Sequence, residues 1–200
     1  MKIGIIFLGN PGLKYKNTKH NYGYMLFNKL IDVSYNTEND YSINFIKCVD
    51  HSEYITYVHQ FKDRECFLIK TLTGINNTGN ILKKYNFRFD LSIVIVDDIY
   101  LKFKKNKLHR KKIHNGHNGL KSIFNIWDNN YNIFLYRLGI GPQNMMDLDK
   151  FVLSKFTQSD IKFILSKSIS GVWSMLNKIF FSSKDKMIEE IMNECNVTYE

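Results

Sequence analysis

The sequence predicts an α/β fold, a single domain in which a mixed, largely parallel twisted sheet is flanked by helices. Short apolar runs typical of buried strands alternate along the chain with longer segments of helical periodicity. The 200 residues, 44% of them hydrophobic, are enough to bury one sizeable core. With two prolines and 11 glycines, the composition is far from that of disordered or linker-rich chains.

Residues 2–8 are almost continuously apolar and end in a Gly-Asn-Pro-Gly turn, as a strand buried on both faces does. A helix is predicted from about residue 21 to residue 31. Residues 53–60 and 65–70 alternate or run apolar like strands, with a Lys-Asp-Arg hairpin turn between them. We expect this hairpin to be the antiparallel exception in the sheet.

Residues 75–85 have a helical pattern, and residues 91–96 (LSIVIV) form the clearest buried strand in the chain. Asp97 and Asp98 follow that strand at once, and a basic segment comes next. The remaining pattern predicts a helix at 119–127, a strand at 133–138 and helices at 157–179 and 184–194.

We find no internal repeat, and we assign residues 1–180 to the domain and residues 181–200 to a helical C-terminal tail. The cysteines, Cys48, Cys66 and Cys195, show neither zinc-site spacing nor a disulfide framework. No stretch is apolar for the ~18 residues that a membrane span needs. We therefore expect a soluble cytoplasmic monomer without metal or cofactor.

The net charge of +9 favours a polyanionic partner such as nucleic acid, because lysine and arginine release counterions from phosphate backbones. The alternative is a lysine-rich composition inherited from an AT-rich genome, since the chain has no alanine.

Polar residues gather where the predicted strands end, which is where α/β sheets carry their sites. Each such segment alone is typical of a turn, a solvated loop or a helix cap. Together they supply a histidine, a carboxylate and several amides, a set suited to ester hydrolysis. These segments hold Gly9 to Gly12 with Tyr15, His20 and Asn21; Asn76 and Asn77; Asp97 and Asp98; and His114 to Gly119.

Four sequence blocks resemble the bacterial-type peptidyl-tRNA hydrolase family, in its order and spacing. The first is LGNPGLKYKNTKHNYGY, which spans residues 8–24. The others are IVDDIYL at 95–101, HNGHNGLKSI at 114–123, and the pair RLGIG and FVLSKF at 137–141 and 151–156. The resemblance covers residues 2 to about 178 and implies that family's fold.

The resemblance implies an enzyme that hydrolyses the ester bond of peptidyl-tRNA, or N-substituted aminoacyl-tRNA, without a covalent nucleophile. It makes His20 the general base for water, and an imidazole titrates near ~6.5, close to the working pH. Asp97 would orient His20, and Asn10 would position water or substrate. Asn76 and Asn118 would bind the substrate near the ester, with their amides facing a developing oxyanion, and Tyr15 would lie beside the terminal adenosine and ribose.

The chain departs from the family in places. Gly74 and Ile75 stand where an aromatic residue and a methionine are usual in the family. The resemblance places Gly74 in the wall of the substrate groove, so this wall would be altered. Thr71 replaces a proline, and residues 111–113 replace glycines.

The basic segment between Asp97 and Asn118 would bind the tRNA acceptor stem, the alternative being a solvated loop. The family match also gives Arg137 a phosphate contact, a task that suits a guanidinium. The histidines at 109, 114 and 117 have no carboxylate or cysteine at metal-site spacing, so we expect no metal. The basic segment contains Lys102, Lys104, Lys105, Lys107, Arg110, Lys111 and Lys112.

Two rival functions remain. An RNA-binding protein with this fold but without catalysis would not need Asn10, His20, Asp97, Asn76 and Asn118 together. A Rossmann-type nucleotide enzyme would need a longer glycine fingerprint than Gly-Asn-Pro-Gly.

Overall fold

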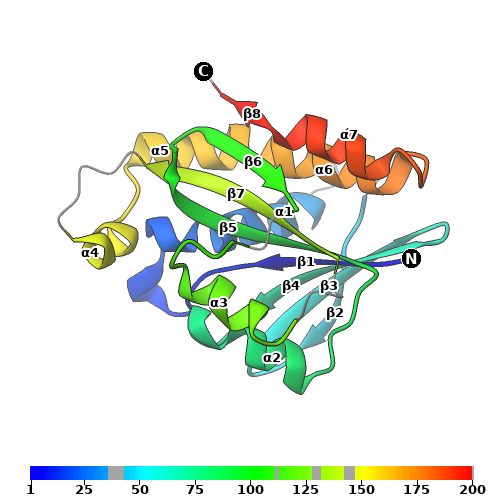
Figure 1. The fold of residues 1–200 in the computed structure, drawn as a ribbon, viewed down its shortest axis with the longest axis horizontal. Helices are drawn as coiled ribbons and strands as arrows, with labels where there is room; N and C mark the ends of the chain where they lie inside the picture. Colours follow the sequence, from blue (N-terminus) through cyan, green and yellow to red (C-terminus); the bar gives the residue numbers. More distant parts are fainter. Residues whose placement is uncertain (36–42, 111–112, 128–131, 142–146, 200) are drawn as a thin grey trace.

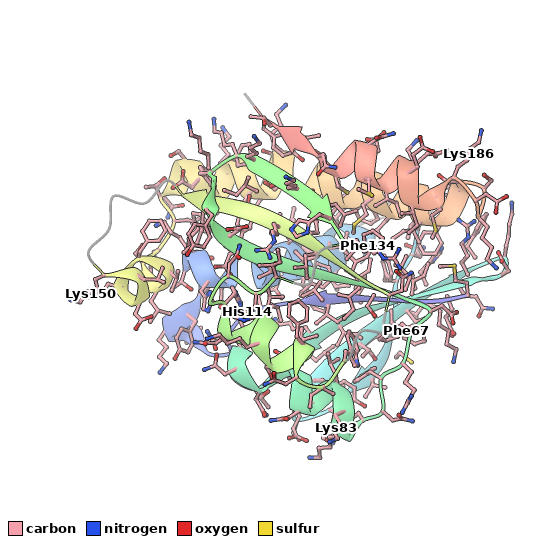
Figure 2. All side chains as sticks on the ribbon, in the orientation of Figure 1. Phe67, Lys83, His114, Phe134, Lys150 and Lys186 are labelled. Atoms are coloured by element: carbon pink, nitrogen blue, oxygen red, sulfur yellow. The ribbon has the colours of Figure 1, made fainter. Side chains whose placement is uncertain are left out.

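The computed structural model describes residues 1–35, 43–110, 113–127, 132–141 and 147–199. One mixed sheet lies between two layers of helices (Figure 1). Side chains fill the space between the sheet and both layers (Figure 2). This arrangement confirms the α/β fold class expected from the sequence.

The sheet has parallel strands at its centre and antiparallel strands at both edges. Its strands are β1 Lys2–Phe7, β2 Ile46–Asp50, β3 Tyr54–Phe61, β4 Arg64–Thr71, β5 Leu91–Lys102, β6 Lys105–His109, β7 Ile133–Gly141 and β8 Val197–Thr198. They lie in the order β2-β3-β4-β1-β5-β7-β6-β8. The pairs β4–β1, β1–β5 and β5–β7 are parallel, and the others are antiparallel.

The helices form a larger layer on one face of the sheet and a smaller layer on the other (Figure 1). They are α1 Tyr22–Tyr35, α2 Thr78–Lys84, α3 Asn118–Phe124, α4 Leu148–Leu153, α5 Gln158–Phe163, α6 Ile169–Phe181 and α7 Met187–Cys195. Short 3-10 turns cover Leu13–Tyr15, Lys19–Asn21 and Ile75–Asn77, and a π-turn at Ile164–Ser168 joins α5 to α6.

The two core clusters follow from the alternation of side chains along the strands. In β5, Ile93 and Ile95 pack with α1 and α6, whereas Val94 and Val96 pack with α2 and α3. Continuous apolar runs therefore correspond to the central strands, as the sequence predicted.

The antiparallel part of the sheet is larger than the single predicted hairpin. That prediction was incomplete because β2, β6 and β8 carry weak apolar signals. In β6 the buried Asn106 and Leu108 alternate with exposed lysines, so the strand reads as a basic loop. Strand β5 also continues to Lys102, so Asp97 and Asp98 lie within it rather than after it.

The segment 181–200 contains α7 and β8. Met187, Ile191 and Cys195 of α7 belong to the larger core cluster, and β8 pairs with β6. The division of the chain at residue 180 stays a prediction. Within the described ranges, we find no helix with both the length and the apolar character needed to cross a bilayer.

Candidate active site

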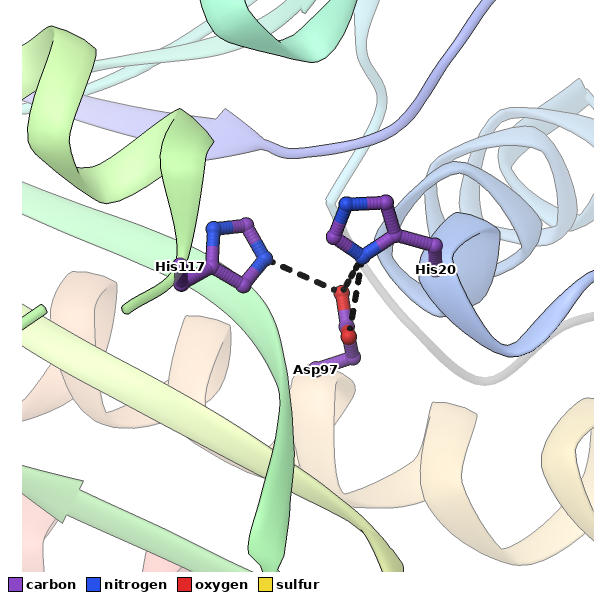
Figure 3. A group of neighbouring side chains, drawn as sticks. All are labelled: His20, Asp97 and His117. Atoms are coloured by element: carbon purple, nitrogen blue, oxygen red, sulfur yellow. Dashed lines mark hydrogen bonds and ion pairs between the residues drawn. The ribbon is translucent and has the colours of Figure 1, made fainter. Parts of the chain in front are cut away.

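The catalytic pair predicted from the sequence comes together at the carboxyl side of the central strands. After β1 the chain turns through Gly12, whose φ of 97° lies in a region that glycine favours. The following 3-10 turn Lys19–Asn21 holds His20 above β5 (Figure 3). Nδ1 of His20 lies 3.1 Å from both carboxylate oxygens of Asp97.

A second histidine shares this carboxylate. Nε2 of His117, just before α3, lies 3.3 Å from Oδ1 of Asp97 (Figure 3). The two imidazole centroids are 4.8 Å apart. Sequence reasoning included His117 in the 114–119 segment and in a histidine triple, but gave it no catalytic role. Its place in the motif before Asn118 was the signal that could have identified it as a site residue.

Hydrogen bonding assigns the protons of the two rings. Nδ1 of His117 accepts the backbone N–H of Leu120, as the N-cap of α3, so a neutral His117 carries its proton on Nε2. That N–H donates to Asp97. Because an ionised carboxylate only accepts, Nδ1 of His20 donates to it as well. The lone pair of a neutral His20 is then on Nε2, pointing away from Asp97.

Burial and the charge of Asp97 act on His20 in opposite directions. The side chains of His20 and Asp97 are 14% and 2% exposed. Burial lowers the pKa of His20, but the charge and hydrogen bond of Asp97 outweigh it, with a further contribution from Asp149, and the net pKa is raised. Burial raises the pKa of Asp97, but His20 and His117 bring it well below its usual range.

Asp98 belongs to a different interaction, because neighbouring side chains on a strand point to opposite faces. Its Oδ2 accepts from Nη1 of Arg137 at 3.1 Å, and both side chains are less than one-tenth exposed. Nε of Arg137 also donates to His109 at 2.7 Å, and Nη2 donates to the carbonyl of Ile113. The predicted phosphate contact of Arg137 stays a prediction, and this enclosed pairing weakens it.

Asn10 links the turn after β1 to the segment before α2. Its Oδ1 accepts the backbone N–H of Ile75 at 2.9 Å. Asn21 holds the Asn10 backbone on both sides, accepting its N–H at 2.7 Å and donating to its carbonyl at 2.9 Å. Within the described part of the chain, Nδ2 of Asn10 has no acceptor and remains available to a ligand.

The other predicted substrate residues are exposed or half-buried. Asn118 is the first residue of α3 and is exposed. The N-cap of α3 is His117, so Asn118 does not serve as the helix cap. Asn76 and Gly74 are exposed in the segment before α2, and Tyr15 is half-buried. A Cβ on Gly74 would lie 3.9 Å from Oδ1 of Asn10.

Close packing of α2 against α3 fixes the segments that carry Asn76 and Asn118. A Cβ added to Gly79 would come within 1.9 Å of the carbonyl oxygen of Ser122, so only glycine permits this approach. The N–H of Gly79 donates to the Ser122 hydroxyl at 2.9 Å.

The basic segment includes a strand near one edge of the sheet rather than a loop, and we call its residues Lys105, Lys107 and Arg110 the basic edge. Lys105 and Lys107 are exposed on β6, and Arg110 is exposed directly after it. Lys111 and Lys112 lie outside the described residues.

His20, Asp97 and His117 also form a possible metal-binding group, with ligand atoms within 4.8 Å of one another. The nitrogens that face each other there carry the protons donated to Asp97, so a metal would have to displace them. The donor set as it stands fits a hydrogen-bonded triad better than a metal centre, and the expectation of no metal stays a prediction.

Comparisons with known proteins agree with the sequence resemblance. A family model described as peptidyl-tRNA hydrolase matches residues 4–200. A peptidyl-tRNA hydrolase of Onion yellows phytoplasma is 35% identical over 182 residues, 89% of each chain. One from a Sulfurihydrogenibium species is 34% identical over 197 residues, 96% of each chain. The crystal structure of peptidyl-tRNA hydrolase from Acinetobacter baumannii matches with a TM-score of 0.75 and 23% identity, covering 98% of this chain and 94% of that chain.

Proposed function

The chain belongs to the peptidyl-tRNA hydrolase family, and from this membership we propose that His20 activates the water that cleaves the substrate. The protein is an enzyme that hydrolyses the ester bond of peptidyl-tRNA, releasing free tRNA and peptide. The observation that carries the proposed mechanism is the hydrogen bond from Nδ1 of His20 to Asp97, which leaves a lone pair on Nε2.

In the proposed reaction, Nε2 of His20 takes a proton from water as the water oxygen attacks the ester carbonyl carbon. Asp97 stabilises the resulting imidazolium, as the carboxylate of a hydrolytic triad does. The tetrahedral intermediate then collapses, the bond from the carbonyl carbon to the ribose oxygen breaks, and His20 returns the proton to that oxygen. Atoms and charges balance without a cofactor.

Amide donors around the pair supply the stabilisation that the oxyanion requires. Nδ2 of Asn10 and the exposed amide of Asn118 are the donors that we assign to the substrate carbonyl. Asn76, Gly74 and Tyr15 would line the adjoining substrate surface. We place the acceptor stem against the basic edge of Lys105, Lys107 and Arg110, and we expect a cytoplasmic monomer.

The direct test compares blocked and free substrates. We expect the purified protein to release amino acid from N-acetyl-aminoacyl-tRNA and to leave unblocked aminoacyl-tRNA essentially intact. EDTA in buffer with excess magnesium should not change the rate. RNA binding without release would favour the non-catalytic RNA-binding alternative, whereas abolition by EDTA would favour a metal at the His20, Asp97 and His117 group.

The basic edge makes its own prediction. Replacing Lys105 and Lys107 together by Gln should raise KM and reduce the slope of log kcat/KM against log salt by about one unit per lost phosphate contact. A matched double variant, Lys2→Gln with Lys83→Gln, removes two exposed charges elsewhere and should keep the wild-type slope. An unchanged slope in the first variant would mean that these lysines are only solvated.

A further inference from the structure

A groove that shares no lining residue with the cavity around His20 and Asp97 carries a positive charge that the proposed chemistry does not use. Its volume is about 560 Å³, within the range of ligand-binding pockets. It starts at Asn10 and runs between α1, the end of β4 and the α5–π-turn segment. Its apolar lining includes Leu13, which is 85% exposed, with Leu72, Ile161 and Leu165.

Lys70 is the most unusual residue in this groove. Its ammonium lies 4.7 Å from the centre of the Tyr24 ring and 5.4 Å from that of Phe27. Nζ donates to Oδ1 of Asn28 at 2.8 Å, and it has no other hydrogen-bond acceptor among the described residues. Burial lowers the pKa of Lys70, as expected for an ammonium partly withdrawn from water.

The groove has an excess of positive charge. Lys29 pairs with Asp32 at 3.6 Å, whereas Lys70 and Lys16 pair with no carboxylate in the described part of the chain. A half-buried ammonium without a counter-ion is costly, and a bound anion would relieve that cost. The groove is therefore suited to a ligand that combines a carboxylate with apolar groups.

The strand order separates this groove from the basic edge. Asp97 is on β5, Lys70 is two strands away through β1, and Lys107 is two strands away in the opposite direction through β7. At about 4.8 Å between strands, each lysine position is roughly 10 Å to the side of β5. The peptide and the tRNA are attached on the two sides of the ester, so a substrate whose ester lies at His20 extends away from His20 on both sides. If RNA occupies the β6 side, the peptide extends towards Lys70.

We propose that this groove binds the peptide of peptidyl-tRNA and that Lys70, assisted by Lys16, favours peptides with an acidic side chain near the ester. The proposal rests on the function proposed above. Because an extended chain advances about 3.3 Å per residue, a span of roughly 10 Å places the favoured acidic residue about third from the ester.

The test uses three substrates that differ in one side chain: acetyl-Asp-Gly-Phe-tRNA, acetyl-Asn-Gly-Phe-tRNA and acetyl-Lys-Gly-Phe-tRNA. We expect wild type to prefer Asp over Asn by about tenfold in kcat/KM, as for a charge-assisted hydrogen bond, and to cleave the Lys substrate least well. Lys70→Met should bring the Asp/Asn ratio close to one, and Lys70→Arg should largely keep it. Lys186→Met, at the end of the molecule remote from α4, should keep the wild-type ratio (Figure 2).

Three outcomes would overturn the proposal. One is an Asp/Asn ratio near one in wild type, and another is a ratio that persists in Lys70→Met. The third is that Lys70→Met lowers kcat/KM equally for all three substrates and reduces the dependence of kcat/KM on salt. That result would assign the groove to an RNA phosphate.

A binding experiment separates this proposal from the proposed catalytic function. NMR of lysine-labelled protein should show the pKa of Lys70 rise when acetyl-Asp-Gly-Phe-amide binds, and change much less with the Asn peptide. If no tRNA substrate is cleaved, the proposed catalytic function fails while this titration still decides the groove. No response to the Asp peptide would refute the groove proposal even in an active enzyme.

Discussion

Replacing His20 with Ala should lower kcat by about 10²-fold or more, the usual contribution of a general base. The ring removed is the one whose Nδ1 donates to Asp97 and whose Nε2 is available to water. Binding of deacylated tRNA should remain close to wild type, because this side chain is only 14% exposed and lies away from β6. The measurements are single-turnover hydrolysis of N-acetyl-aminoacyl-tRNA and a tRNA binding titration.

His59→Ala provides the control for loss of an imidazole. His59 is on β3, where Nδ1 donates a hydrogen bond to the carbonyl of Asn44 and the ring packs against Phe180. Its removal should leave the rate per folded molecule unchanged. If His20→Ala retained full activity, another base would have to replace it in the mechanism.

Asp97→Asn should reduce the plateau rate by about 10²-fold, because it removes the charge that stabilises the His20 imidazolium and sets an NH₂ group against one of the two histidines. Asp97 accepts an N–H from His20 and one from His117, whereas an asparagine has one acceptor and one donor group. If the NH₂ takes the place of Oδ2, it faces Nδ1 of His20 and favours the tautomer with its proton on Nε2, which lacks the lone pair used for catalysis. If it faces His117, that ring is left without an N–H, since its Nδ1 already accepts from Leu120.

The same substitution should move the acidic limb of the kcat/KM profile to lower pH. His20 acts as a base only when neutral, so this limb follows its pKa in the free enzyme. The charge of Asp97 raises that pKa, and its removal leaves burial, which lowers it. Asp149→Asn should shift the limb in the same direction by a smaller amount. The measurement is a pH–rate profile at fixed ionic strength.

Asp98→Asn separates catalysis from stability. It should leave the acidic limb in place, because Asp98 contacts Arg137 and not His20. It should lower the free energy of unfolding by about 2 kcal/mol, since it leaves a buried guanidinium without its carboxylate. If the pH limb moved in Asp98→Asn but not in Asp97→Asn, the assignment of the carboxylate would be reversed.

Much of the site could be read from the sequence because the chemistry depends on short motifs that the fold keeps rigid. The motif around His20 follows β1, and the motif IVDDIYL begins near the end of the apolar part of β5. Both motifs were therefore expected at the carboxyl side of the sheet. The sequence match selected Asp97 over Asp98. Strand alternation explains why both cannot reach His20.

Other parts of the site were not visible in the sequence because they depend on contacts between distant segments. The bond from His117 to Asp97 joins residues 20 positions apart, and the capping bond of Leu120 sets the His117 tautomer. The sequence also did not show that Arg137 is buried against Asp98. Lys70 looked like any lysine in a lysine-rich chain.

By itself, the sequence determined the α/β class, the central parallel strands and the motifs that carry His20 and Asp97, because apolar runs and motifs are local properties. Only the tertiary structure decided the outer strands β2, β6 and β8, whose polar sequences become strands by pairing with a neighbour. It also decided which charges are paired. Ion pairing and burial depend on the distance between side chains in space, which separation along the chain does not fix.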